Sequence, residues 1–203
     1  YYDTEYKILI DSEDEDQLYR IDAGEKIFRL DHQAKIFLAK VAPPTGATVL
    51  DYGCAKGGTL KRVLDRRPDL RVRLFDVSEM YLPFWRRFLT EDCWSTYRPR
   101  AEWTGTCDIV VSFFALEHVA DPLAMLREIR ALLKPGGQLY LIVPDTYANT
   151  ADFVVSDHVN HFSPASLTAL FERAGFRTVS IDAGAHDSAL VAIATHAEQA
   201  PQV

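Results

Sequence analysis

Short apolar segments alternate with helix-like segments through most of this chain, and this alternation constrains the fold more than any other feature. The apolar segments are 48–52, 71–77, 107–113 and 138–143. They are mainly continuous apolar runs, so each is expected to be a strand that is buried on both faces. Such strands occur in parallel sheets that helices cover on both sides. The sequence therefore predicts an α/β fold built on a mostly parallel sheet.

Helix start and stop signals separate these strands. Asp121-Pro122 and Ser163-Pro164 each combine a side-chain acceptor with proline at the first helical position, which is a strong helix start. A proline pair at 43–44 ends an earlier helix, because proline lacks the amide donor and disfavours helix in the residue before it. The expected helices are 22–42, 57–66, 78–89, 122–133 and 163–174.

The last two expected strands lie close together in sequence. Strands 176–181 and 189–195 are joined by residues 182–188. This link is too short for a helical crossover and suits an antiparallel hairpin. We therefore expect one reversed strand near the edge of the sheet.

The charge is unevenly distributed along the 203 residues. The net charge is −7, and residues 1–20 hold seven acidic and two basic side chains, which leaves −2 for the other 183 residues. An acidic arm on a near-neutral body is a poor match for nucleic acid, whose binding requires phosphate neutralisation. We expect no nucleic-acid partner and treat the arm as a solvated extension.

Three cysteines are far apart in the sequence, and no Cys-x-x-Cys pair occurs. They are Cys54, Cys93 and Cys107. An odd number of unpaired cysteines argues against a disulfide framework and for a reducing compartment. No apolar run approaches the ~20 residues that a membrane span needs, and no signal peptide is visible. The expected location is the cytoplasm, with no membrane partner.

The most informative segment for function is 49–60. An apolar strand containing Asp51 near its end enters a loop of small residues that opens a helix. The small residues of this loop are Gly53, Ala55, Gly57 and Gly58. They leave the backbone uncovered, and the helix start offers unpaired N–H groups, so a ligand can pack on the loop. Ala55 stands where the dinucleotide fingerprint needs glycine, and the segment lacks the Gly-Lys-Ser/Thr end of a phosphate loop.

A second acid follows at the end of the next strand. Asp76 lies 18 positions after Gly58. Ligands of open α/β sheets lie outside the carboxyl ends of the strands, and an acid at this position can bind a ribose diol. The alternative is that Asp76 belongs to a helix start before Ser78.

Together these motifs resemble the class I S-adenosylmethionine-dependent methyltransferases. The loop 51–60 reads D-x-G-C-x-x-G-x-x-L, with Ala55 at the usual middle glycine. Asp76, the fourth-strand segment 108–112, the Leu-Glu-His-Val segment 116–119 and the entry to the fifth strand at 133–137 follow in the order of the family. The resemblance implies a Rossmann-like three-layer sandwich with a seven-stranded, mostly parallel sheet whose last strand is reversed.

The resemblance also implies S-adenosyl-L-methionine as cofactor and a domain organisation. Residues 1–44 would form an acidic arm and a helix able to cap the substrate, 45–197 the cofactor-binding methyltransferase domain, and 198–203 a tail. The acid that often lies near the adenine has no clear match in the poorly patterned segment 91–96. The expected cofactor-binding residues are Asp51, Gly53, Cys54, Ala55, Gly57, Gly58, Asp76, Val77, Ser112, Phe113 and Phe114.

Segments 116–119 and 157–163 look like those of small-molecule methyltransferases, some of which act on sugars. The expected function is methyl transfer to a small-molecule acceptor, such as a sugar or nucleotide-sugar of polysaccharide or natural-product biosynthesis. The alternatives are an RNA or protein methyltransferase, or a non-catalytic S-adenosylmethionine-binding module of a larger protein. The net charge and the lack of an Asn-Pro-Pro-Tyr-type motif at 112–115 count against methylation of nucleobase amines.

An oxygen or carbon acceptor must lose a proton, and histidine suits that task near neutral pH. His158 and His161 lie in the loop after the fifth strand, which emerges over the expected cofactor site. We expect one of them to be the general base, His158 in preference, with Asn160 orienting the acceptor. The alternative is that His161 and Asn160 only hold the loop in place.

No metal is expected. Glu117-His118 resembles part of a Glu-x-x-Glu-His ligand motif of some RNA and quinone methyltransferases, but Phe114 stands at its first position. Two adjacent residues make an incomplete site, so His118 is expected to be packed or hydrogen-bonded. Aromatic residues at 81–85, Tyr147 and the tyrosines of the arm (Tyr1, Tyr2, Tyr6) are candidates for shaping the acceptor pocket.

Overall fold

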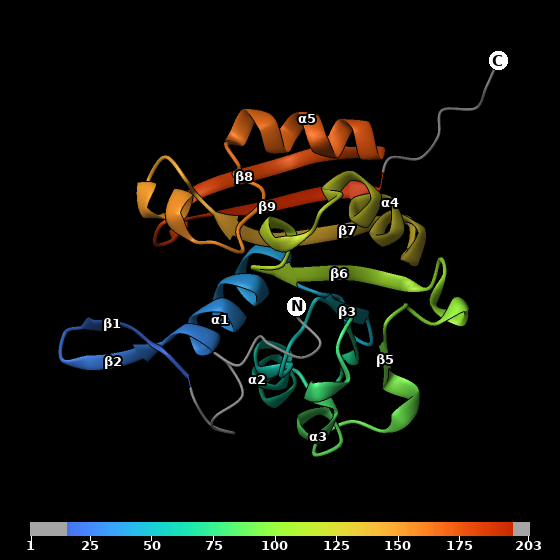
Figure 1. Cartoon of the computed structure of the whole chain (residues 1–203). Helices are drawn as coiled ribbons and strands as arrows, with labels where there is room; N and C mark the ends of the chain where they lie inside the picture. The colour runs from blue at the N-terminus through green and yellow to red at the C-terminus, as the bar shows by residue number, and fades with distance from the viewer. Residues whose placement is uncertain (1–15, 197–203) are drawn as a thin grey trace.

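The computed structural model describes residues 16–196, shown in Figure 1. Most of the acidic arm, including Tyr1, Tyr2 and Tyr6, and the expected tail 198–203 lie outside the described residues. The centre of the fold is a seven-stranded sheet in the order β5-β4-β3-β6-β7-β9-β8. Its strands are β3 (Thr48–Tyr52), β4 (Arg71–Asp76), β5 (Trp94–Thr96), β6 (Cys107–Phe113), β7 (Leu133–Pro144), β8 (Phe176–His186) and β9 (Ala189–His196).

One strand of the sheet runs against the others, as expected. β9 pairs antiparallel with both β7 and β8, and the other pairs in the sheet are parallel. β8 and β9 form the expected hairpin, although both strands extend further than predicted and leave a two-residue turn at 187–188. The reversed strand is the last in sequence and lies next to the edge strand β8, so the fold class predicted from the sequence is confirmed.

Helices cover both faces of the sheet (Figure 1). Successive strand residues point to opposite layers: Val49 and Ile109 pack with α1 and α2, whereas Leu50 and Val110 pack with α4 and α5. Because each strand must bury both of its faces, continuous apolar runs are the sequence pattern that this architecture requires. The helices are α1 (Arg29–Val41), α2 (Gly58–Arg66), α3 (Leu82–Trp85), α4 (Pro122–Leu132) and α5 (Pro164–Ala174).

The two predicted helix starts are confirmed in atomic detail. The side chain of Asp121 accepts a hydrogen bond from the Ala124 amide at 2.9 Å, with Pro122 in the first turn of α4. The side chain of Ser163 accepts from the Ser166 amide at 3.1 Å, and the Ser166 hydroxyl completes a capping box at the start of α5.

Two helix predictions were wrong. Residues 22–28 are not helical: β1 (Leu18–Asp22) and β2 (Glu25–Phe28) form a separate hairpin before α1. Ala23 and Gly24 both have positive φ, which is the geometry of a tight two-residue hairpin turn. The segment 78–89 contains only a 3-10 turn (Glu79–Tyr81) and the short α3.

Two further details differ from expectation. The short strand β5 at the edge of the sheet was not predicted, because three residues carry no periodic pattern. The turn expected at 134–137 is an irregularity inside β7, between the pairs Cys107↔Leu133 and Ile109↔Gln138. All three cysteines are free. Within the described range, no helix combines the length and apolar character that crossing a membrane requires.

Candidate functional site

The expected cofactor residues lie at one edge of the sheet, where β3, β4 and β6 end. Because these strands are parallel, their carboxyl ends meet at this edge, which is where ligands of open α/β sheets bind. β7 ends at the same edge and leads into residues 145–163, which we call the histidine loop. The fold therefore brings together the two segments that carry the sequence predictions.

The loop 53–58 between β3 and α2, here called the cofactor loop, is tightly folded. The amides of Gly53 and Cys54 both donate to the Phe75 carbonyl at 2.9 and 3.1 Å, and the Trp85 indole donates to the Ala55 carbonyl at 2.7 Å. A Cβ on Gly53 would lie 2.7 Å from the Cβ of Ala115, so glycine is required there. Ala55 adopts φ 45°, the left-handed conformation that glycine would take without strain.

Two buried carboxyl groups lie beneath this loop. Asp76 accepts from the Ala55 amide at 2.8 Å and from the Ser78 amide at 3.1 Å, so it holds the loop and the following turn together. Asp51 is 2% exposed, and its Oδ1 has no hydrogen-bond partner among the described residues. Burial raises the pKa of both groups, and the charge of Asp76 raises that of Asp51 further.

These carboxyl groups fit the cofactor that the sequence predicts. S-adenosylmethionine carries an ammonium and a sulfonium group, and an unsatisfied buried carboxyl oxygen is a suitable partner for a cation. Asp76 retains acceptor capacity, because each carboxylate oxygen has two lone pairs. The start of α2 at Gly58 adds backbone N–H groups at this edge.

The other predicted cofactor residues have differing environments. The hydroxyl of Ser112 is buried and donates to the Tyr52 carbonyl at 2.9 Å, which is a contact between strands. Val77 is exposed. Cys54 is buried, and this burial raises the pKa of its thiol. The Phe113 ring packs beside Tyr140. Phe114 has a positive φ, and the Arg29 guanidinium lies 4.2 Å from the centre of its ring.

A ring cluster adjoins Phe114 on the side of the N-terminal hairpin. The rings of Tyr19 and His32 stack at 4.2 Å, and His186 packs edge-on against Phe114 at 5.3 Å. The Tyr19 hydroxyl accepts from the Asp187 amide at 2.6 Å. This contact joins the β1–β2 hairpin to the β8–β9 turn.

The histidine loop is organised by a residue that the sequence analysis did not single out. Asp152 is 4% exposed and lies 2.5 Å from Nδ1 of His158, 3.0 Å from Nδ1 of His161 and 2.9 Å from the Thr146 hydroxyl. Burial alone would raise the pKa of Asp152, but the hydrogen bonds from His161, His158 and Thr146 outweigh it and lower that pKa. Asp152 is therefore an ionised acceptor shared by both predicted histidines.

The side-chain amide of Asn160 is hydrogen-bonded to two backbone carbonyls. Its amide donates to the Val119 carbonyl at 2.6 Å and the Leu116 carbonyl at 3.4 Å. The backbone amides of Val159 and Asn160 both donate to the Glu117 carbonyl, at 2.9 and 3.0 Å. These bonds attach the histidine loop to the turn after β6, as in the alternative role considered for Asn160. Its role in orienting an acceptor stays a prediction.

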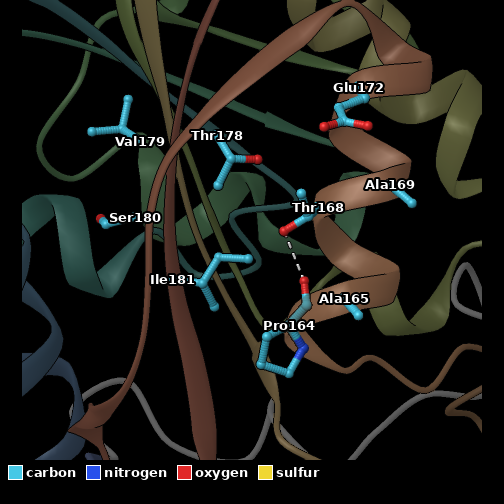
Figure 2. A pocket seen from close by; sticks show the side chains of 9 residues that line it. All are labelled: Pro164, Ala165, Thr168, Ala169, Glu172, Thr178, Val179, Ser180 and Ile181. Carbon is cyan, nitrogen blue, oxygen red and sulfur yellow. Dashed lines mark hydrogen bonds between the residues drawn. The ribbon is translucent and has the colours of Figure 1, made fainter.

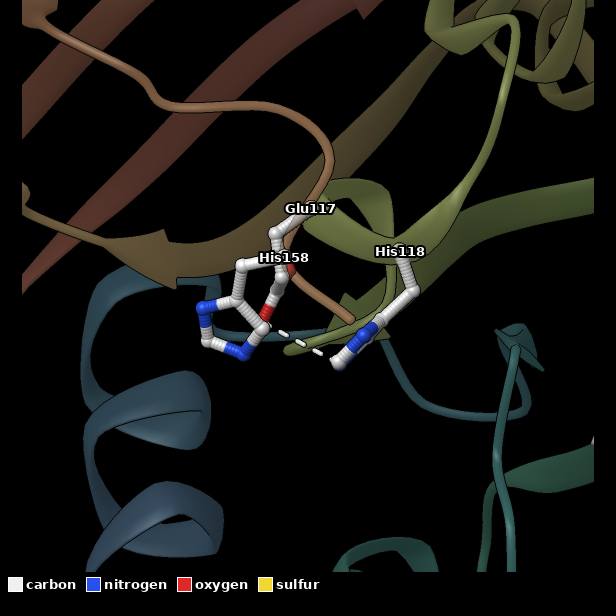
Figure 3. A group of neighbouring side chains, drawn as sticks. All are labelled: Glu117, His118 and His158. Atoms are coloured by element: carbon white, nitrogen blue, oxygen red, sulfur yellow. Dashed lines mark ion pairs between the residues drawn. The ribbon is translucent and has the colours of Figure 1, made fainter. Parts of the chain in front are cut away.

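Glu117 and His118 lie in that turn, next to His158 (Figure 3). Glu117 is 1% exposed, and neither carboxyl oxygen has a hydrogen-bond partner among residues 16–196. Burial raises the pKa of Glu117 to about 8. Nδ1 of His118 lies 3.1 Å from the Asp157 carbonyl oxygen, as expected for a hydrogen-bonded histidine, and its ring packs edge-on against His158 at 4.7 Å.

These three side chains could bind a divalent cation. One ligand atom of each lies within 4.8 Å of the others. Sequence reasoning did not find the group, because His158 is distant from Glu117-His118 in the chain. A structural zinc site uses four protein ligands, one more than this group offers. The absence of a metal from the site stays a prediction.

The residues considered for the acceptor pocket separate into two groups. Tyr81 and Trp85 are buried in the core, whereas Tyr147 is exposed on the histidine loop. A groove of about 670 Å³ lies elsewhere, between α5 and the edge strand β8 (Figure 2). None of the predicted site residues lines this groove.

Comparisons with known proteins identify the family of this chain. A family model described as a methyltransferase domain matches residues 26–181. The ubiquinone biosynthesis O-methyltransferase of Xanthomonas campestris pv. campestris is 38% identical over 124 residues, which are 56% of this chain and 47% of that protein. The chain thus spans about half the length of the curated relatives that it matches.

Solved structures share the fold. A methyltransferase in complex with the Trm112 activator of Haloferax volcanii has a TM-score of 0.67 and 22% identity, covering 82% of this chain and 90% of that one. The 1,6-didemethyltoxoflavin-N1-methyltransferase of Burkholderia thailandensis, with S-adenosylhomocysteine bound, has a TM-score of 0.60 and 21% identity, covering 83% and 78%. From the family match and this shared fold, the chain belongs to the methyltransferase domain family of class I S-adenosylmethionine-dependent methyltransferases.

Proposed function

We propose that this chain transfers the methyl group of S-adenosylmethionine to a hydroxyl oxygen of a small-molecule acceptor. The observation that carries the proposal is the pair of histidines held by Asp152 at the same edge of the sheet as the cofactor loop. The curated relatives are named as O-methyltransferases, which supports oxygen as the acceptor atom. Sugars and hydroxylated aromatic rings are the two acceptor classes to compare.

The cofactor site would consist of the cofactor loop, Asp51 and Asp76. Asp76 would hold the ribose hydroxyls, and Asp51 would face a cationic group of the methionine portion. When bound, the cofactor supplies an electrophilic methyl group on a positively charged sulfur. Holding the acceptor oxygen in line with that methyl can contribute several kcal/mol to the rate.

His158 is the proposed general base. Its Nε2 would accept the hydroxyl proton while the acceptor oxygen forms its bond to the methyl carbon, and the bond from that carbon to sulfur breaks. The products would be the methyl ether, S-adenosylhomocysteine and a protonated imidazole. Asp152 would stabilise the imidazolium through the hydrogen bond at Nδ1.

The first experiment tests the cofactor site. Calorimetric titration with S-adenosylhomocysteine should show micromolar binding by the wild-type chain, and Asp76→Asn should weaken it at least tenfold. Asp69→Asn is the matched control, because Asp69 is part of an ion pair with Arg67 away from the cofactor loop and should bind like wild type. A folded wild-type chain that does not bind would refute the proposal.

The second experiment tests the transfer. Methyl-labelled S-adenosylmethionine is incubated with nucleotide sugars, catechol-type phenols and bulk tRNA, and labelled product is measured. Label in a small-molecule ether that falls by about 10² or more in His158→Ala supports the proposal. His196→Ala, whose ring bonds to the Lys134 carbonyl at 3.1 Å, is the control and should retain activity. Label in tRNA alone would instead support the RNA alternative.

A further inference from the structure

Asp152 contacts both candidate bases, in each case at Nδ1 of the imidazole ring. Its Oδ1 lies 2.5 Å from Nδ1 of His158, and its Oδ2 lies 3.0 Å from Nδ1 of His161. The Thr146 hydroxyl donates to Oδ2 at 2.9 Å. A single buried carboxyl group therefore has three neighbours able to donate hydrogen bonds.

This geometry determines where each imidazole carries its hydrogen. An ionised carboxylate can only accept hydrogen bonds, so a ring nitrogen facing it must be an N–H donor. Both histidines face Asp152 with Nδ1, and a neutral imidazole has one N–H. Nε2 of each ring is then left with a free lone pair, which is the form that can accept a proton.

We infer that Asp152 is a positioning residue that fixes His158 and His161 in the Nδ1–H tautomer, so that Nε2 is the nitrogen of each ring that can accept a proton. This inference rests on the proposed function for its catalytic consequence. The tautomers themselves depend only on the described contacts.

Each ring also packs against a neighbouring aromatic ring. His158 packs edge-on against His118 at 4.7 Å, and His161 packs against Phe153 at 4.8 Å. Asp152 is held by the short 3-10 helix Thr150–Val154, whose first turn is capped by Asn149. The backbone that carries the carboxyl group is thus held in a short helical turn, and the lowered pKa of Asp152 agrees with an ionised acceptor.

A purely structural clamp is the competing explanation, because Asp152 also joins Thr146 to the end of the loop. The two explanations differ in what Asp152→Asn should do. An amide of the same size can keep part of the clamp, but its NH₂ group donates and cannot accept from an Nδ1–H. At least one ring must then change its tautomer or lose its bond.

The test combines ¹⁵N NMR of histidine-labelled protein with steady-state kinetics. In wild type, the ring nitrogens of His158 and His161, assigned with His158→Gln and His161→Gln, should both show N–H at Nδ1. Asp152→Asn should move at least one ring to the Nε2–H form and lower kcat by about 10² or more. The KM for S-adenosylmethionine and the midpoint of thermal unfolding should change little, and Asp152→Glu should recover part of kcat.

Asp145→Asn is the matched control. Asp145 lies in the same loop and accepts from the amides of Tyr147 and Ala148, but it does not contact either histidine. It should leave both tautomers unchanged. Nε2–H tautomers in wild type, or unchanged tautomers and kcat in Asp152→Asn, would overturn the inference. If the tautomers are as inferred but no acceptor is methylated, the proposed function fails and the positioning stands.

Discussion

Glu117→Gln should change how the stability of this protein depends on pH. Glu117 is buried without a hydrogen-bond partner among the described residues, and burial raises its pKa from 4.5 to about 8. Between these values the folded chain keeps a proton that the unfolded chain has lost. The free energy of unfolding therefore decreases as the pH rises through this window, and the full contribution is present only below the unfolded pKa.

The size of the effect follows from the shift. Each pH unit within the window changes the free energy of unfolding by about 1.4 kcal/mol for one group. From about pH 5 to about pH 7.5, Glu117 should therefore reduce the stability of the wild type by about 3 kcal/mol. Glutamine is neutral throughout, so Glu117→Gln should lack this decrease. Its amide also needs partners in the same buried place, so only the change with pH is diagnostic.

Urea unfolding at several pH values, followed by circular dichroism, measures the difference. The other titrating groups are common to both proteins and cancel when the two curves are subtracted. Glu172→Gln on the exposed face of α5 is the control and should track the wild type. A constant difference between wild type and Glu117→Gln across the range would refute the reasoning, because Glu117 would then be ionised and paired in the folded protein.

Three further predictions concern the cofactor loop and the cluster of Figure 3. Gly53→Ala should weaken binding of S-adenosylhomocysteine at least tenfold, because the new Cβ would lie 2.7 Å from the Cβ of Ala115. Gly46 has a similar φ and open space around it, so Gly46→Ala is the control and should bind like wild type in the same titration. Ala55→Gly should stabilise the protein by up to about 1 kcal/mol in urea unfolding, since relief of left-handed strain exceeds the added entropy of glycine; a loss of stability would contradict this. Dialysis against EDTA should change the rate of methyl transfer by no more than about twofold, because the proposed proton transfer to His158 uses no metal. If activity is lost and a divalent cation restores it, Glu117, His118 and His158 are instead metal ligands.

The buried strands were the easiest part of the fold to predict. Thr48–Tyr52 and Cys107–Phe113 have the predicted bounds, because a strand covered by helices on both faces must be a continuous apolar run. The β1–β2 hairpin was missed because it stands apart from the sheet and its strands are mostly exposed, so no buried face imposes a pattern on it. A helical periodicity that is valid for α1 was therefore extended too far toward the N-terminus.

The cofactor loop could be predicted from sequence because its contacts are local and its backbone demands small residues. The acceptor side could be predicted only in part. The histidines could be singled out because imidazole is suited to proton transfer near neutral pH. Asp152 lies in a segment without a motif, and Glu117 is close to His158 only in the folded chain. Such groupings depend on tertiary structure, and one sequence without its fold contains no local signal for them.

The bond between Tyr19 and Asp187 has a consequence for the order in which the parts of this chain can fold. Its partners are 168 residues apart, and contacts of such separation form late because a long loop must close first. During synthesis the β1–β2 hairpin leaves the ribosome long before the β8–β9 turn exists. The cofactor loop needs nothing beyond Ala115 for the contacts described above, so it can take shape on a shorter nascent chain. The ring cluster beside Phe114 can be assembled only when the last hairpin has been made, so the cofactor loop can form before the contact that joins the two hairpins.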